Sequence, residues 1–124
     1  MPITDEQAEA TVRQYLALVA DGTAEQIAAL YAEDAVLEDP VGSEPLRGRA
    51  AIQAFYAAIE PLQVTTSLTT IRTCGGEAAF AFHIETDTGA GVAILDPLEA
   101  MVFGEDGLIT SMRAWWGAQD MTFA

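Results

Sequence analysis

A glutamate inside an apolar segment is the first candidate for chemistry in this sequence. Glu99 shares strand parity with Met101 and Phe103, so we expect its side chain on the apolar face of a strand. Burial penalises a charged carboxylate and raises its pKa, and a carboxyl held neutral can donate a hydrogen bond. At a strand edge, Glu99 would reach solvent instead. Asp96 has the opposite parity, so only one of these two acids should face the interior.

A second carboxyl lies where an apolar segment meets a turn. Asp39 follows the apolar run 35–37 and precedes Pro40. Asp-Pro is common in exposed turns, and the pattern by itself favours that interpretation of Asp39. Glu38 would then point in the opposite direction, towards solvent.

Four aromatic side chains carry polar atoms that are expected in the interior. Tyr15, Tyr31 and Tyr56 each lie on the apolar stripe of a predicted helix, and a buried phenol needs a hydrogen-bond partner. Their convergence indicates a cluster of bonded hydroxyls, although backbone carbonyls could also satisfy each one. Trp115 and Trp116 end the last predicted strand, and one of them should face inward. An indole N–H suits a carboxylate, and plain core packing is the alternative.

The remaining reactive residues form no clear site. His83 is the only histidine and has the opposite parity to Phe80 and Phe82, so we expect it on the outer face. Cys74 is the only cysteine, which excludes an internal disulfide and fits a reducing, cytoplasmic setting. No metal-ligand spacing and no glycine-rich phosphate loop is present in the sequence.

The composition excludes several classes of partner. The chain has 124 residues, 51% of them hydrophobic, and a formal net charge of −14. This length fits one domain, residues 1–124, with a core of its own. An acidic surface repels nucleic-acid phosphates and anionic lipid, so we expect neither nucleic acid nor a membrane as partner. No apolar run approaches membrane-spanning length, and the first residues do not resemble a signal peptide.

Helices are predicted in the first half of the chain, where they would position Tyr15, Tyr31 and Tyr56. Capping-box spacing begins one helix at Thr4, and a second such spacing begins another at Thr23. A third helix fits residues 49–59 because its apolar residues fall on one side.

Strands are predicted in the second half, which is rich in β-branched and aromatic residues. The predicted strands, including one short early segment, are residues 35–37, 64–73, 78–85, 92–103 and 108–116. Pro97 indicates a bulge or an edge within the fourth of these. Helices followed by an antiparallel meander predict an α+β fold, with helices on one face of a curved sheet and an apolar pocket between them.

The run EDPVGSEP at residues 38–45 closely resembles a loop of the bacterial ketosteroid isomerases, also called steroid Δ5-isomerases. Further similar segments follow in the family's order at residues 13–15, 31–35, 54–56, 78–82 and 111–114. The resemblance covers essentially the whole chain. It implies the cone-shaped fold of the nuclear-transport-factor-2-like superfamily, with three N-terminal helices on a curved, mostly antiparallel sheet. It also implies a homodimer packed through that sheet.

The resemblance implies catalytic roles for named residues. Asp39 matches the general base, which takes a proton from the carbon between the C3 carbonyl and the C5 double bond of a steroid and returns it to C6. Tyr15 matches the phenol that donates to the dienolate oxygen. In some members, Tyr31 and Tyr56 hydrogen-bond that phenol, and Trp116 steadies the base. This proton transfer needs no cofactor.

One position departs from the family pattern. The second donor to the dienolate oxygen is an aspartic acid in the family, and Glu99 stands in its place here. A protonated glutamic acid can do the same chemistry, but its additional methylene moves the donor. A reshaped pocket, a different preferred substrate or a lower rate would follow from this change.

Apolar walls are expected around a small, flat ketone such as a steroid. The residues expected to form them are Leu16, Phe55, Phe80, Phe82, Val92, Met101 and Trp116. Two alternatives to a steroid isomerase stay open. Glu99 keeps open a polyketide-cyclase-like enzyme acting on another cyclic ketone. The other is a non-catalytic module for an apolar ligand, which the pairing of Asp39 with Tyr15 disfavours.

Overall fold

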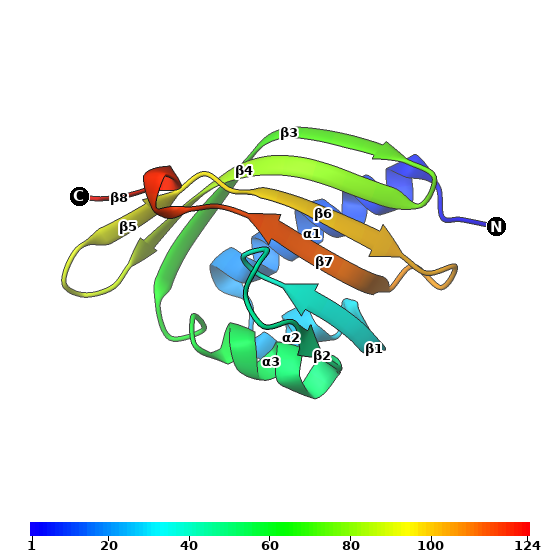
Figure 1. Ribbon diagram of the computed structural model, residues 1–124, viewed down its shortest axis with the longest axis horizontal. Helices are drawn as coiled ribbons and strands as arrows, with labels where there is room; N and C mark the ends of the chain where they lie inside the picture. The colour runs from blue at the N-terminus through cyan, green and yellow to red at the C-terminus, as the bar shows by residue number, and fades with distance from the viewer.

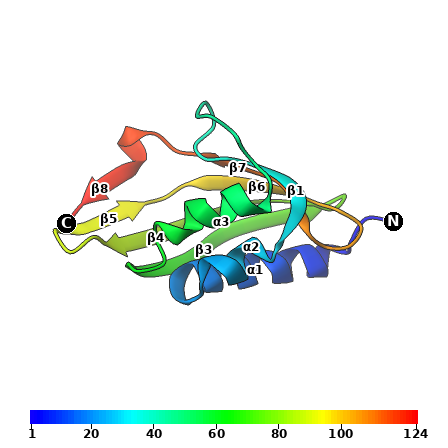
Figure 2. The same cartoon turned by 90° about the horizontal axis from the view of Figure 1, so that it is seen from below.

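Three helices lie against one face of a curved sheet of eight strands (Figures 1 and 2). The computed structural model describes all residues from 1 to 124. The helices are α1 (Asp5–Asp21), α2 (Ala24–Ala28) and α3 (Arg49–Ala57). This arrangement confirms the α+β fold predicted from the sequence.

Two capping boxes set the beginnings of the first two helices, as predicted. The Thr4 hydroxyl accepts a hydrogen bond from the Gln7 amide at 3.1 Å, and the Gln7 side chain accepts one from the Thr4 amide at 2.8 Å. The same reciprocal pair joins Thr23 and Gln26. Each box satisfies two amides that the first turn of a helix leaves unpaired.

The second helix is shorter than the apolar pattern predicts, and this changes the place of Tyr31. Helix α2 ends at Ala28, and Tyr31 is the first residue of strand β1 (Tyr31–Glu38). The prediction of Tyr31 on a helix is therefore wrong. Its side chain is nevertheless completely buried, as are those of Ala35 and Leu37 further along the same strand.

The other strands follow the predicted order with two differences. They are β2 (Leu46–Arg47), β3 (Gln63–Cys74), β4 (Glu77–Asp87), β5 (Val92–Leu95), β6 (Leu98–Phe103), β7 (Ile109–Trp115) and β8 (Met121–Phe123). The segment predicted as one strand over residues 92–103 forms two strands, because Pro97 has no amide to donate at their junction. Strand β2, the 3-10 helix η1 (Ala118–Asp120) and strand β8 have no counterpart in the prediction.

The sheet order is β2-β1-β7-β6-β4-β5-β8, with β3 paired to the other side of β4. All pairs are antiparallel except β1 and β7, which run parallel and bring the chain after Glu38 beside the end of β7. The sheet is therefore mostly antiparallel, but it is not a simple meander. No helix has both the length and the apolar character needed to cross a bilayer.

Candidate active site

An apolar cavity of about 200 Å³ lies between the helices and the sheet. Its lining residues are Tyr15, Val19, Asp39, Phe55, Tyr56, Ile59, Phe82, Ile84, Leu95, Pro97, Glu99 and Trp116. Asp39 and Glu99 are its two carboxyl groups, and both are among the acids that the sequence singled out. Helix α1, helix α3 and strands β4 to β6 supply most of the apolar wall.

Asp39 faces this cavity from the loop that follows β1. The indole nitrogen Nε1 of Trp116 donates a hydrogen bond to Asp39 Oδ1 at 2.7 Å. Burial raises the pKa of the Asp39 carboxyl above its ordinary value of 3.8, and the bond from Trp116 acts in the opposite direction. Asp39 does lie at a turn, but the expectation of full exposure is wrong, because the carboxyl is half-buried and lines the cavity.

The three tyrosines form one chain of hydroxyl groups. The hydroxyls of Tyr31 and Tyr56 are 2.7 Å apart, and Tyr56 donates to the Tyr15 hydroxyl oxygen at 3.2 Å. A hydroxyl carries one hydrogen, so Tyr31 must donate to Tyr56, and the hydrogen of Tyr15 is left for an acceptor outside the three tyrosines, such as the neighbouring Glu99. Burial raises the pKa of all three phenols well above 10.0, so each keeps its hydrogen.

Arg49 fixes the far end of this chain. Its Nε and Nη2 atoms donate to the backbone carbonyl of Tyr31 at 3.0 and 2.7 Å. Arg49 is the first residue of α3, which also carries Tyr56, so a single contact joins the elements that hold two of the phenols. No pattern in the sequence indicated this contact.

Glu99 is the only buried charged residue of the chain, with 5% of its surface exposed. It faces the interior from β6, as its strand parity predicted, and its oxygen Oε1 is buried without a hydrogen-bond partner. Burial and then the negative charge of Asp39 raise the pKa of Glu99 well above 4.5, and the Tyr15 hydroxyl opposes part of this rise. An unpaired oxygen in an apolar site favours the neutral acid over the carboxylate.

Several residues expected as walls lie elsewhere. Leu16, Phe80 and Met101 are buried in the core and do not line the cavity, and Tyr31 reaches it only through Tyr56. Phe55, Phe82 and Trp116 line it as expected, whereas Val92 does not. The wall residues that sequence reasoning missed are Val19, Ile59, Ile84, Leu95 and Pro97. The parity that Ile84 shares with Phe82 could have indicated one of them.

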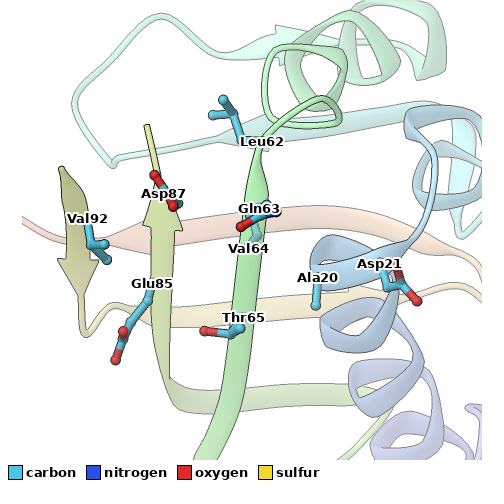
Figure 3. A pocket seen from close by; sticks show the side chains of 9 residues that line it. All are labelled: Ala20, Asp21, Leu62, Gln63, Val64, Thr65, Glu85, Asp87 and Val92. Atoms are coloured by element: carbon cyan, nitrogen blue, oxygen red, sulfur yellow. The ribbon is translucent and has the colours of Figure 1, made fainter. Parts of the chain in front are cut away.

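A larger and more open depression of about 460 Å³ lies beside the end of α1 (Figure 3). Its acidic side chains are Asp21, Glu85 and Asp87. Figure 3 shows the carboxylates of Asp21 and Glu85 pointing away from each other. No buried polar atom without a partner faces this depression, so the apolar cavity is the better candidate site.

His83 and Asp96 lie outside the cavity, as their parity predicted. His83 Nδ1 is 2.7 Å from Asp96 Oδ1, and His83 Nε2 is 2.7 Å from Glu85 Oε2. The side chain of Asp96 is 65% exposed. The structure contains no cluster of three or more histidine, cysteine, aspartate or glutamate side chains suited to a metal ion.

A curved sheet and three helices around an apolar cavity with acid and phenol groups define the class of small α+β proteins to which nuclear-transport-factor-2-like domains belong. Residues 12–112 match the family model of the SnoaL-like domain, and the chain belongs to this family. The chain is 49% identical to the steroid Delta-isomerase of Nocardioides simplex, over 93% of this chain and 94% of that protein. This similarity confirms the resemblance found in the sequence and supports an isomerase.

Other relatives share the fold and differ in their named activity. The epoxide hydrolase LasB of Streptomyces lasalocidi is 32% identical over 91% of this chain, which spans only 44% of that longer protein. The solved structure of SalBIII, an epoxide hydrolase/cyclase-like enzyme, superposes with a TM-score of 0.86 at 25% identity, covering 96% of this chain and 97% of that one. The solved structure of RV0760c from Mycobacterium tuberculosis superposes with a TM-score of 0.89 at 24% identity, covering 98% of this chain and 99% of that one. This similarity shows the fold alone.

Proposed function

We propose that the protein is a steroid Δ5-isomerase, which converts 3-oxo-Δ5-steroids to conjugated 3-oxo-Δ4-steroids through a dienolate. One observation carries this proposal. An aspartate held by an indole N–H shares an apolar cavity with a phenol whose hydrogen is not used by the other two tyrosines. The identity of 49% with an isomerase of steroids supports the substrate class.

Asp39 acts as the base. Its Oδ1 atom is occupied by Trp116, so Oδ2 is the oxygen that takes the proton from C4 and returns it to C6. Burial makes the carboxylate more basic than a solvated aspartate, and the bond from Trp116 opposes this rise in pKa and favours the ionised base. A fixed base can serve both carbons when they lie on the same face of the substrate.

Tyr15 and the protonated Glu99 stabilise the negative charge on the dienolate oxygen. The Tyr15 hydroxyl, which accepts the bond from Tyr56 and gives its own hydrogen to neither of the other tyrosines, is one donor, and a neutral Glu99 adds a second O–H donor. Such donors are effective in an apolar cavity because water does not screen them and they need no reorientation during the reaction. Without them, a ketone α-proton is far too weakly acidic for a carboxylate base.

The size of the cavity limits how the substrate binds. A volume of about 200 Å³ is below the roughly 300–1,000 Å³ of typical ligand pockets. We infer that the reacting end of the steroid enters the cavity and that the distal rings remain near the mouth. Phe55, which lines the cavity and is 37% exposed, is suited to cover part of those rings.

We further propose a cytoplasmic homodimer that packs through the outer face of the sheet. Leu98, Val102 and Trp115 on β6 and β7 are 57%, 37% and 41% exposed. Their strand parity is opposite to that of the residues that face the helices, so they form an apolar outer surface. A second copy of the chain would cover this surface.

The proposal is tested by mixing the protein with 5-androstene-3,17-dione and following the ultraviolet absorbance of the conjugated enone. We expect a rate above buffer that Asp39→Asn lowers by about 100- to 10,000-fold, the usual contribution of a general base. Asp34→Asn, which alters an exposed aspartate on β1, the strand that precedes Asp39, is the matched control. An absorbance that rises no faster than in buffer would overturn the proposal.

The second candidate function is the opening of an epoxide. It takes the place of the alternative considered from the sequence, an enzyme acting on another cyclic ketone. The observation that favours it is a buried acid with a raised pKa in the same cavity as a carboxylate base. Glu99 would give its proton to the epoxide oxygen as the C–O bond breaks, and Asp39 would take the proton of the attacking hydroxyl as the new C–O bond forms. LasB and SalBIII carry names of this chemistry.

A hydroxy-epoxide with an apolar chain separates the two candidates. A cyclic ether or a diol formed without any isomerisation of the steroid would favour epoxide opening. A protein that binds the steroid but transforms neither compound would be a binding module for apolar ligands.

A further inference from the structure

The loop that carries Asp39 is fastened on both faces of the sheet, to β7 and to Trp116, which directly follows β7. On the inner face, Trp116 donates to Asp39 at 2.7 Å. On the outer face, Arg113 Nε donates to Glu38 Oε1 at 2.9 Å. Between them, the Val41 amide donates to the carbonyl of Ala114 at 2.8 Å. These contacts follow from the parallel pairing of β1 with β7, which run side by side (Figure 1) and place Glu38 opposite Arg113.

Glu38 is the centre of the outer-face contacts. Its second oxygen, Oε2, accepts a long hydrogen bond of 3.4 Å from the Gly42 amide within the loop itself. Arg113 in turn lies over the ring of Trp115, with its guanidinium carbon 5.1 Å from the ring centre. The bond from Arg113, and then the bond from the Gly42 amide, lower the pKa of Glu38, so its carboxylate stays charged. One side chain therefore connects the beginning of the loop, the middle of the loop and β7.

We propose that Glu38, through Arg113, is a positioning residue for the base. This proposal rests on the proposed role of Asp39. Adjacent residues of a strand point to opposite faces, so holding the Glu38 side chain on the outer face fixes the backbone from which Asp39 extends into the cavity. The ion pair is partly exposed, with 21% of the Glu38 and 49% of the Arg113 side chain accessible, and such pairs add little stability. A displacement of the base by about 1 Å can cost on the order of 100-fold in rate.

The first test compares Glu38→Ala, Arg113→Ala and the double variant in the isomerase assay. We expect kcat to fall at least about tenfold in each single variant with KM changed less than about twofold, because the substrate contacts are intact. The double variant should be no slower than the slower single variant, since both remove the same contact. Arg113→Lys should recover part of the rate. Glu9→Ala, which breaks the exposed 2.9 Å pair with Arg13 on α1, is the matched control.

The second test does not depend on catalysis. The hydrogen-exchange rate of the Trp116 indole N–H is followed by NMR, and the signal is assigned with Trp116→Phe. We expect faster exchange in Glu38→Ala and Arg113→Ala and no change in Glu9→Ala. A kcat within twofold of the parent together with unchanged indole exchange would overturn the positioning role. A parent protein without isomerase activity would overturn the proposed function instead, and the exchange rates would still decide the positioning of Asp39.

Discussion

The protonation of Glu99 has a consequence for stability that can be measured without any substrate. Glu99→Gln replaces the buried acid by a neutral side chain of nearly the same shape. In the unfolded chain, the carboxyl of Glu99 ionises near its ordinary pKa of 4.5, whereas in the native state burial and Asp39 raise that pKa well above this value. Between the two pKa values, the native protein binds one more proton than the unfolded chain does.

The sign and size of the effect follow from this difference in bound protons. The free energy of unfolding falls as pH rises, by about 1.4 kcal/mol for each pH unit in this interval, and the whole contribution is lost once the pH passes the native pKa. The glutamine variant lacks this loss. As pH rises through the interval in which only the native state keeps the proton, we expect Glu99→Gln to gain stability relative to the parent protein, at this rate for each pH unit.

Urea unfolding of both proteins at about pH 5, 6 and 7 measures this gain. Other titrating groups cancel in the difference between the two proteins, since both share them. Glu77→Gln, which removes an exposed carboxylate at the beginning of β4, is the control for a general change in net charge. Two curves of stability against pH that run parallel would refute a protonated, buried Glu99 and, with it, the second O–H donor.

Three further results are expected from changes around the same cavity and on the sheet. Tyr15→Phe should lower kcat by about 100- to 1,000-fold, the usual effect of losing one donor to a developing negative charge, and steady-state kinetics would measure it. Trp116→Phe removes the bond that opposes the rise in the pKa of Asp39, so the fall of kcat/KM at low pH should move to higher pH in a pH-rate profile. An unchanged pH-rate profile would contradict an effect of Trp116 on the pKa of Asp39. Leu98→Asp puts a charge on the exposed apolar face of the sheet, and light scattering should then report a monomer, whereas we expect the parent protein to form the proposed dimer.

Local patterns in the sequence were sufficient where the structure depends on neighbours along the chain. The capping boxes at Thr4 and Thr23 form as predicted, because each needs only residues three positions apart. The parity of Glu99 placed its carboxyl on the inner face correctly, because alternation is a property of the strand itself.

The same patterns were insufficient where distant segments decide the outcome. Tyr31 fits a helical stripe, but pairing with β7 makes it the first residue of a strand. Asp39 fits an exposed turn, and only Trp116, 77 positions away, shows that its carboxyl belongs to the cavity. Glu38 was expected to point into solvent, because local sequence does not indicate its partner Arg113, which is 75 positions away. Resemblance to a family singled out Asp39 as the proposed base, whereas local chemistry alone did not.

The transfer of one proton by Asp39 can be followed directly with a steroid substrate that carries deuterium at C4. The product formed in ordinary water is analysed by mass spectrometry and NMR for deuterium at C6. We expect a substantial part of the label at C6, because the same Asp39 carboxyl takes the label from C4 and returns it within a cavity of few polar groups. A conjugated product whose label has all been lost to solvent, or a transfer that persists in Asp39→Asn, would contradict Asp39 as the carrier of the proton.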